Sequence, residues 1–314
     1  MARALVDAAA DAGADAVKFQ TYSGADLYSS RTPRFQYLDD DRSPQELLDA
    51  IALPREWQPL LAEHAAARGI HFFSSPFDRA AVDSLAELGV PAMKIASFEL
   101  VDVGLVEYTA ATGIPIIIST GMATYGEVED ALAAVARSGN RQVALLRCAS
   151  LYPAPAEIMN LRAMATMRAA FGVPVGLSDH TTAITVAAGA AALGMAILEK
   201  HMTLDRGLEG PDHPFALEPG EMQAMIAGVR EVEAALGNGR LEGPSEPESG
   251  EMYRNARRSI VAACAIAAGT QITAEMLTVK RPGFGIVPKH LPLVVGRIAK
   301  TDIPEDEIVT WEMV

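Results

Sequence analysis

The sequence has only two cysteines, Cys148 and Cys264, among its 314 residues, and each lies in a largely apolar segment. A disulfide framework needs more cysteines than this, and a thiolate metal cluster needs several close together. We therefore expect both thiols to be buried core side chains.

Long apolar runs are also missing, since no stretch reaches the roughly 20 residues that a membrane-spanning helix requires. The N-terminus has no basic segment ahead of an apolar one, so a secretory signal is not indicated. With a net charge of -14, the chain also lacks the lysine- and arginine-rich surface that a nucleic acid needs. These absences predict a cytoplasmic protein with no membrane partner and no nucleic-acid partner.

Short apolar segments recur along the first two thirds of the chain, and each is followed by an alanine-rich amphipathic stretch. From the second segment onward they are about 20 to 30 residues apart, which is the repeat of a β-strand plus its crossover helix. This pattern predicts a parallel α/β fold. The predicted strands cover residues 16–20, 71–75, 92–97, 115–120, 143–150, 174–178 and 196–201.

The seven predicted strands are one fewer than a closed (β/α)8 TIM barrel requires. The chain opens on a predicted helix, residues 2–13, so a first strand is expected before Met1. An open doubly wound sheet is the alternative, but no Gly-x-Gly-x-x-Gly turn follows the first predicted strand. We therefore predict a (β/α)8 TIM barrel that lacks its first strand.

The barrel domain is predicted to cover residues 1–240, and residues 24–54 form a long predicted loop to which we assign no chemistry. Residues 241–254, rich in Gly, Pro, Ser and Glu, are predicted to be a linker. The remaining residues, 255–314, predict a small domain whose core is small for independent stability, so we expect it to dock on the barrel or on another subunit. Its strand-like pieces cover residues 259–265, 277–280, 293–298 and 308–311.

Polar residues close nearly every predicted strand, and in a barrel the active site lies at these C-terminal strand ends. Lys18 and Lys94 fall inside apolar strands, where an unpaired ammonium group carries a large desolvation cost. An anionic ligand is implied, and an internal salt bridge with a carboxylate such as Glu99 is the alternative. Hydroxyls that converge with two lysines suit a phosphate, and four strands end in a serine: Ser75, Ser97, Ser119 and Ser178.

Two of the six histidines, His180 and His201, close consecutive predicted strands. This position places two imidazoles side by side at the mouth of the barrel. Two neutral imidazoles with open coordination positions suit a divalent transition metal, with water or substrate completing its shell. We predict a metal site at these two residues and structural roles for His64, His71 and His290.

Ten short strings, spread over nearly the whole chain, resemble the sialic acid synthase family, including its legionaminic, pseudaminic and spore-coat polysaccharide relatives. These enzymes make nonulosonic acids from phosphoenolpyruvate and an N-acetylated six-carbon sugar. The strings are AGADAVKFQT (12–21), FSSPFD (73–78), KIASFE (94–99), STGM (119–122), LYPAP (151–155), GLSDHT (176–181), EKHMTLD (199–205), GPDH (210–213), RRSI (257–260) and KRPGFGI (280–286).

The resemblance implies a set of site residues at the matching positions. It implies that phosphoenolpyruvate is held by Lys18, Ser75, Lys94, Ser97, Ser119 and Ser178. It implies sugar contacts from Gln20, Tyr152 and Asp212, and catalytic roles for Glu99 and Lys94. It also implies a divalent metal at His180 and His201, typically Mn²⁺ with Mg²⁺ or Co²⁺ as alternatives, which would orient and polarise the aldehyde oxygen of the sugar.

The C-terminal residues resemble the antifreeze-like (SAF) domain of the family, which in relatives reaches across to the partner subunit of a domain-swapped homodimer. Arg281 then matches the arginine that is contributed to the sugar site of the neighbour. The implied activity is that of an N-acetylneuraminate synthase-type transferase. It joins phosphoenolpyruvate to N-acetylmannosamine or a diacetamido-trideoxy analogue by a C–C bond and releases phosphate.

Relatives carry a first strand with a Glu-Ile-Gly-x-Asn-His-x-Gly type motif, whose glutamate is catalytic, and no residue of this sequence can be assigned that role. We therefore expect the natural start to lie upstream of Met1. The alternative function is that of a truncated, non-catalytic paralogue that binds phosphoenolpyruvate or the sugar without turning them over.

Overall fold

The computed structural model describes residues 1–34 and 41–314, which divide into two compact units, Met1–Gly237 and Asn238–Val314. Phe35 and Tyr37 of the predicted long loop lie outside the described residues. Within those ranges, no helix combines the length and the apolar character that crossing a bilayer would require.

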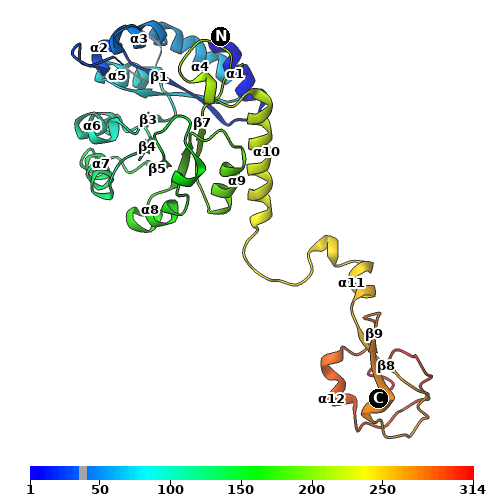
Figure 1. The fold of residues 1–314 in the computed structure, drawn as a ribbon. Helices are drawn as coiled ribbons and strands as arrows, with labels where there is room; N and C mark the ends of the chain where they lie inside the picture. Colours follow the sequence, from blue (N-terminus) through cyan, green and yellow to red (C-terminus); the bar gives the residue numbers. More distant parts are fainter. Residues whose placement is uncertain (35–40) are drawn as a thin grey trace. The chain divides into compact units, whose positions relative to one another are not determined.

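A parallel sheet forms the centre of the first unit, and its seven strands follow one another in chain order (Figure 1). Sequential parallel strands with intervening helices are the arrangement of a (β/α) barrel, so the predicted fold class is confirmed. The strands are β1 (Ala16–Thr21), β2 (His71–Pro76), β3 (Met93–Ile95), β4 (Ile116–Ser119), β5 (Val143–Cys148), β6 (Val175–Asp179) and β7 (Leu198–Lys200).

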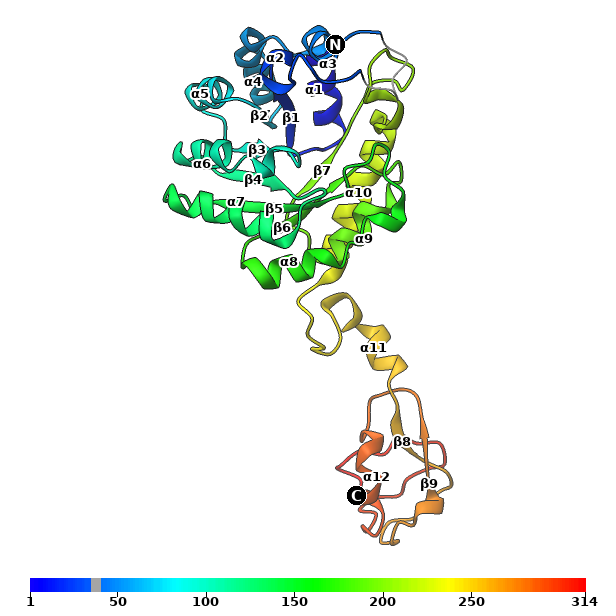
Figure 2. The same ribbon diagram turned by 60° about the vertical axis from the view of Figure 1, so that its left-hand side comes forward.

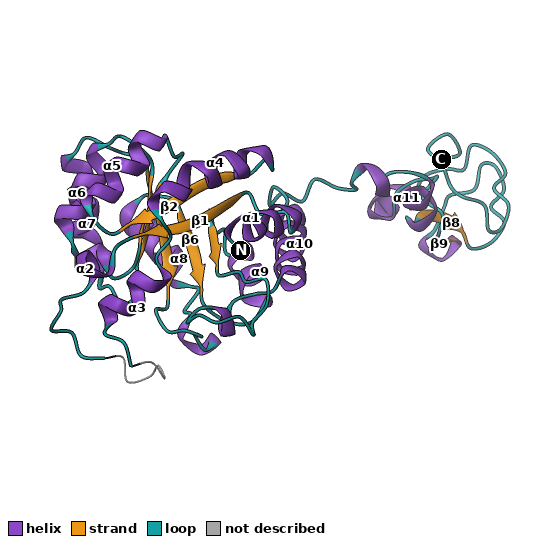
Figure 3. Ribbon diagram, turned by 90° about the horizontal axis from the view of Figure 1, so that it is seen from above, coloured by secondary structure: helices purple, strands orange, loops and turns teal. Residues whose placement is uncertain are grey.

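Helices cover the outside of this sheet (Figures 2 and 3). The α-helices are α1 (Ala2–Asp11), α2 (Gly24–Leu27), α3 (Pro44–Ile51), α4 (Gln58–Ala67), α5 (Arg79–Leu88), α6 (Val103–Ala111), α7 (Tyr125–Arg137), α8 (Ala163–Phe171), α9 (Thr185–Ala192) and α10 (Pro219–Leu236). Short 3₁₀ turns are η1 (Arg55–Trp57), η2 (Glu99–Val101), η3 (Ala156–Ile158) and η4 (His213–Phe215). The first and last helices of the unit, α1 and α10, pack against each other.

Local sequence signals fix where the helices that follow β2 and β4 begin. Asp78 caps α5 by accepting a hydrogen bond of 2.7 Å from the Ala81 amide, and that helix ends at Gly89, whose φ of 73° favours glycine. Thr124 and Glu127 form a capping box at the start of α7. Because each cap lies a few residues beyond a strand end, the short loops at these strand ends are held in place.

Apolar strand residues bury completely against the helices. Ile95, Ile118, Leu145 and Leu177 have no solvent-exposed surface, and they pack with α6, α7 and α8 residues in one cluster. Burying an aliphatic side chain of this size contributes about 1.5–3 kcal/mol each. The sheet is therefore a rigid platform for the polar residues at its carboxyl edge.

The second unit contains η5 (Glu246–Glu248), α11 (Glu251–Ala256), the antiparallel pair β8 (Ser259–Ala262) and β9 (Leu277–Lys280), η6 (Ala274–Met276), η7 (Pro288–His290) and α12 (Leu291–Val294). The predicted strand at 293–298 is only partly correct, because Leu293 and Val294 belong to α12, whereas Ile298 forms an isolated antiparallel bridge with Gln271. The predicted strand at 308–311 is reduced to a single bridge between Ile308 and Val261. The core of the second unit contains Ile260, Ile272, Ile303 and Val309.

The segment 241–254, predicted as a linker from its composition, contains η5, where Ser245 and Glu248 form a capping box, and most of α11. One expectation about the cysteines is corrected in this unit. Cys264, expected in the core, is exposed, because it follows the end of β8 in a turn, whereas Cys148 is buried as predicted.

Candidate active site

The register of the sheet places the predicted site residues on one face at the carboxyl ends of the strands. Gln20 lies beside Ser75 across β1 and β2, and Ser178 lies between Cys148 and Glu199 across β5, β6 and β7. Strand alternation then puts side chains two residues apart on the same face, which adds His180 and His201 to this set. The strand ends therefore converge as the sequence predicts for a barrel.

Glu199 is the partner of both lysines that the sequence places inside apolar strands. Lys18 Nζ lies 2.9 Å from Glu199 Oε1, and Lys94 Nζ lies 3.8 Å from Oε2. The alternative of an internal salt bridge is thus realised, although with Glu199 and not with Glu99. Burial opposes ionisation of Glu199, but the two ammonium groups outweigh it and hold the pKa of this carboxyl at about 2.

Lys94 is the more deeply buried of the two lysines, with 2% of its side chain exposed. Its ammonium group donates to Ser119 Oγ at 2.6 Å and to the Ile95 carbonyl at 2.9 Å. Desolvation lowers its pKa to about 8, against the attraction of Glu199. Two ammonium groups facing one carboxylate leave an excess of positive charge at this end of the sheet, which favours an anionic ligand.

The predicted phosphate-binding hydroxyls lie at the same strand ends. Ser75, Ser119 and Ser178 are buried, and Ser119 is already oriented by Lys94. Ser75 Oγ has no hydrogen-bond partner among the described residues. Because a buried hydroxyl without a partner is costly, Ser75 is suited to a ligand that supplies an acceptor.

Ser97 is positioned by a close approach of two loops. The Gly121 amide donates to Ser97 Oγ at 3.0 Å. A Cβ at Gly121 would lie 2.0 Å from Ser150 Oγ and 2.7 Å from Ser97 Oγ, so only glycine fits here. The next residue, Met122, has a φ of 62°, which is unfavourable for a residue other than glycine and often occurs in functional loops.

Glu99, predicted to be catalytic, starts η2 just after β3. Its Oε2 atom is buried without a hydrogen-bond partner among the described residues. Desolvation raises its pKa from 4.5 to about 7, with Lys94 acting in the opposite direction. A carboxyl that titrates near neutral pH can both donate and accept a proton under working conditions.

The two predicted metal ligands are neighbours, since the ring centroids of His180 and His201 are 5.2 Å apart. His180 Nδ1 lies 2.8 Å from the Ala149 carbonyl oxygen, and His201 Nδ1 lies 3.5 Å from Asp212 Oδ2. With each Nδ1 protonated toward its oxygen partner, both Nε2 atoms keep a free lone pair. Oxygen partners of this kind are what orient imidazoles that bind metals.

The donor set fits a divalent cation that shares its shell with substrate. Among residues 1–34 and 41–314, no group of three or more His, Cys, Asp or Glu side chains is arranged to hold a metal ion by itself. Two imidazoles with open positions therefore suit a cation that gains its remaining ligands from water and substrate oxygens.

Aromatic rings line the space beside the imidazoles. The ring of Tyr152 lies 4.2 Å from that of His180 and 5.4 Å from that of Phe215, and Phe215 lies 5.2 Å from His201. Desolvation raises the pKa of Tyr152, so its hydroxyl remains a hydrogen-bond donor. Of the predicted sugar-binding residues, Tyr152 and Asp212 are thus gathered at the imidazoles, while Gln20 is exposed on β1.

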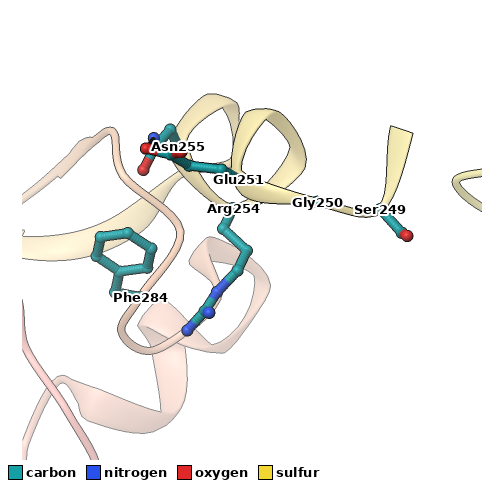
Figure 4. A pocket seen from close by; sticks show the side chains of 6 residues that line it. All are labelled: Ser249, Gly250, Glu251, Arg254, Asn255 and Phe284. Carbon is teal, nitrogen blue, oxygen red and sulfur yellow. Dashed lines mark hydrogen bonds between the residues drawn. The ribbon is translucent and has the colours of Figure 1, made fainter. Parts of the chain in front are cut away.

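Arg281, the remaining predicted sugar-binding residue, belongs to the second unit, where it is exposed next to β9. The same unit has a hollow of about 460 Å³ lined by Ser249, Gly250, Glu251, Arg254, Asn255 and Phe284 (Figure 4). The guanidinium of Arg254 lies 5.4 Å from the Phe284 ring centre, and this cation–π contact connects α11 to the loop after β9.

Glu199 is the site residue that sequence reasoning missed. It belongs to the EKHMTLD string, but its role as the partner of Lys18 and Lys94 was not assigned. Side chains alternate along a strand, so Glu199 lies on the same face as His201, two residues later. This alternation could have identified Glu199 as a site residue.

A sequential (β/α) sheet with lysines, hydroxyls and an imidazole pair at its strand ends defines a barrel protein whose site suits a small anionic ligand. The chain belongs to the NeuB family, whose model matches residues 5–241. A SAF domain model matches residues 257–314.

Characterised relatives carry names of sugar-acid synthases. The chain is 37% identical to an N,N'-diacetyllegionaminic acid synthase of Legionella pneumophila, over 99% of this chain and 89% of that protein. It is 35% identical to a pseudaminic acid synthase of Campylobacter jejuni, over 96% of this chain and 89% of that protein. A crystal structure of an N-acetylneuraminic acid synthetase from Leptospira borgpetersenii superposes with a TM-score of 0.70 at 32% identity, covering 80% of this chain and 84% of that one.

Proposed function

We propose that this protein is a synthase that condenses phosphoenolpyruvate with an N-acetylated hexose to form a nonulosonic acid and releases inorganic phosphate. Membership of the NeuB family and the names of its relatives support this class of reaction. The hexose in our proposal is N-acetylmannosamine or a diacetamido-trideoxy analogue of it.

One observation carries the proposal. Glu199 contacts Lys18 and Lys94, and it stands two residues before His201 on the same face of β7. The two lysines and the imidazole pair are therefore next to each other. A two-substrate condensation needs this adjacency, because one substrate is a phosphorylated carboxylate and the other an aldehyde.

Phosphoenolpyruvate occupies the cationic side in this proposal. Lys18 and Lys94 offset the negative charge of its carboxylate and phosphate groups, and the hydroxyls of Ser75, Ser97, Ser119 and Ser178 donate to its oxygens. The unpartnered Ser75 hydroxyl and the orienting bonds on Ser97 and Ser119 support this assignment.

The sugar occupies the imidazole side. A divalent cation held by His180 and His201, Mn²⁺ in our proposal, would supply Lewis-acid polarisation of the sugar aldehyde. Tyr152 and Phe215 pack against the imidazoles, and Asp212 holds the orientation of His201.

The reaction joins C3 of phosphoenolpyruvate to the aldehyde carbon, and the aldehyde oxygen takes up a proton. Water then adds at C2, and the tetrahedral intermediate breaks its C–O bond to phosphate, which leaves a keto acid and inorganic phosphate. Glu99, with a pKa of about 7, is suited to move these protons, and Lys94 stabilises charge that develops on the departing phosphate.

The test is phosphate release from phosphoenolpyruvate in the presence of Mn²⁺ and a sugar panel of N-acetylmannosamine and its diacetamido-trideoxy analogues. We expect phosphate and the nonulosonic acid to form in equal amounts, and only with both substrates. Binding of phosphoenolpyruvate without any turnover, for every sugar, would replace this proposal with that of a non-catalytic paralogue.

A further inference from the structure

A buried ion pair lies on the outward face of the two strands that carry the imidazoles. Asp179 and Lys200 are register partners across β6 and β7, with Lys200 Nζ 2.8 Å from Asp179 Oδ2. Their side chains are 0% and 3% exposed. Each is the residue immediately before a histidine of the site, His180 or His201.

Because side chains alternate along a strand, this pair points away from the site. The pair nevertheless holds the backbone segments that carry the site residues. Ser178 and Glu199 face inward, so Asp179 and Lys200 face outward, and the next residues face inward again. The ion pair is thus one peptide unit away from both imidazoles. A shift of β6 against β7 at this point would change the distance between His180 and His201 directly.

The same pair also holds the loop that follows His180. Asp179 Oδ1 accepts a hydrogen bond of 2.9 Å from the Thr181 amide. The Lys200 ammonium donates to the Thr181 carbonyl and, at 3.5 Å, to the Ala183 carbonyl. His180 is therefore held by polar contacts on the residues before and after it.

Stability alone gives no reason for charged groups at this place. Replacing a buried ion pair by apolar side chains of similar volume is often neutral or stabilising, whereas removing one partner is costly. What charge and directed hydrogen bonds contribute is geometric definition, because each donor fixes the position of a particular acceptor. Geometric definition of this kind matters most beside groups whose separation must be fixed, such as two imidazoles that bind one cation.

We propose that Asp179 and Lys200 are positioning residues that set the separation and orientation of the two imidazoles for a divalent cation. This inference rests on the metal site proposed above. It assigns to the buried pair a function in cation affinity that is separate from its contribution to folding.

The experiment compares the full-length protein with the double variant Asp179→Leu/Lys200→Met, which replaces the charges by apolar side chains. Free Mn²⁺ is followed by electron paramagnetic resonance in a titration without substrate. We expect a lower melting temperature, because the Thr181 amide and carbonyl lose their partners, and in the folded variant a Mn²⁺ dissociation constant that is about 10- to 100-fold higher. The double variant Asp179→Asn/Lys200→Met keeps an acceptor oxygen for the Thr181 amide and leaves no single buried charge, so it should show a smaller rise and serves if the first double variant does not fold.

The matched control is an exposed ion pair of the same unit, Arg137 with Glu107, whose Nη2–Oε2 distance is 2.7 Å. Arg137→Met/Glu107→Gln should bind Mn²⁺ as the unmodified protein does. An unchanged dissociation constant in a folded Asp179→Leu/Lys200→Met protein would overturn the inference and leave the metal site standing.

A readout without metal separates the two proposals. ¹⁵N spectra of the imidazole rings report the protonated nitrogen of each histidine, and we expect the double variant to shift the signals of His180 and His201. If the unmodified protein binds no Mn²⁺, the metal site fails. Unchanged ring signals in the variant would then dismiss the positioning role as well.

Discussion

At the scale of single residues, the site combines groups whose chemistry differs because their surroundings differ. Glu99 and Glu199 are both carboxyls near Lys94, yet burial raises the pKa of the first to about 7 and two ammonium contacts lower that of the second to about 2. One is therefore suited to proton transfer and the other to fixed charge.

The raised pKa of Glu99 makes a prediction about stability and pH. Because the folded protein binds this proton more tightly than the unfolded chain, the contribution of Glu99 to stability is present below pH 4.5 and is lost as pH rises to about 7. We therefore expect the free energy of unfolding of Glu99→Gln, relative to that of the unmodified protein, to be higher at pH 8 than at pH 5. Chemical denaturation at both pH values measures this, and an equal difference at the two would contradict the assignment.

Gly121 makes a second prediction at this scale. A Cβ there meets Ser150 and Ser97 hydroxyls, so Gly121→Ala must displace both. We expect a loss of about 1–3 kcal/mol of stability together with weaker phosphoenolpyruvate binding. Gly126→Ala is the control, because a Cβ there lies 4.0 Å from its nearest neighbour and α7 gains a better helix former. Equal behaviour of the two variants in denaturation and calorimetry would refute the steric explanation.

At the scale of elements, the two edges of the sheet, β1 and β7, are connected through the side chains of Lys18 and Glu199. We expect Glu199→Gln to destabilise the protein by about 3 kcal/mol, because two lysines lose their common partner. Inorganic phosphate should restore part of this loss. Glu107→Gln, in an exposed pair, should cost at most about 1 kcal/mol. Thermal unfolding with and without phosphate distinguishes these cases, and a phosphate effect of equal size in both variants would argue against an anion site at the lysines.

Elements differ in how well the sequence predicts them, for physical reasons. The inner strands β2 to β6 are largely buried and the edge strands β1 and β7 are partly buried, so all seven read as short apolar runs and all seven were predicted. The second unit has short strands with little periodicity, and there the first two residues of a predicted strand, Leu293 and Val294, belong to α12. Contacts between strands distant in sequence, such as that of Glu199 with Lys18, depend on closure of the sheet and could not be derived from local pattern.

At the scale of the whole molecule, Arg281 and the strand-end site belong to different units of the chain. The family resemblance implies a homodimer in which Arg281 completes the sugar site of the partner subunit, and this arrangement predicts complementation. We expect Arg281→Ala and Lys94→Ala to be nearly inactive separately and a mixture of the two, refolded together, to regain about a quarter of the activity per site. Phosphate-release assays on the mixture test this, and a mixture without any gain would exclude sharing between subunits.

The Lys18–Glu199–Lys94 contacts have a consequence for binding energetics. The protein without substrate carries its own counterion between the two ammonium groups. An arriving anion must therefore exchange with a carboxylate that is already in place, and its net affinity is the difference between two pairings. In the proposed reaction the same exchange would favour release of phosphate, because the Glu199 carboxylate competes with that anion for the two lysines.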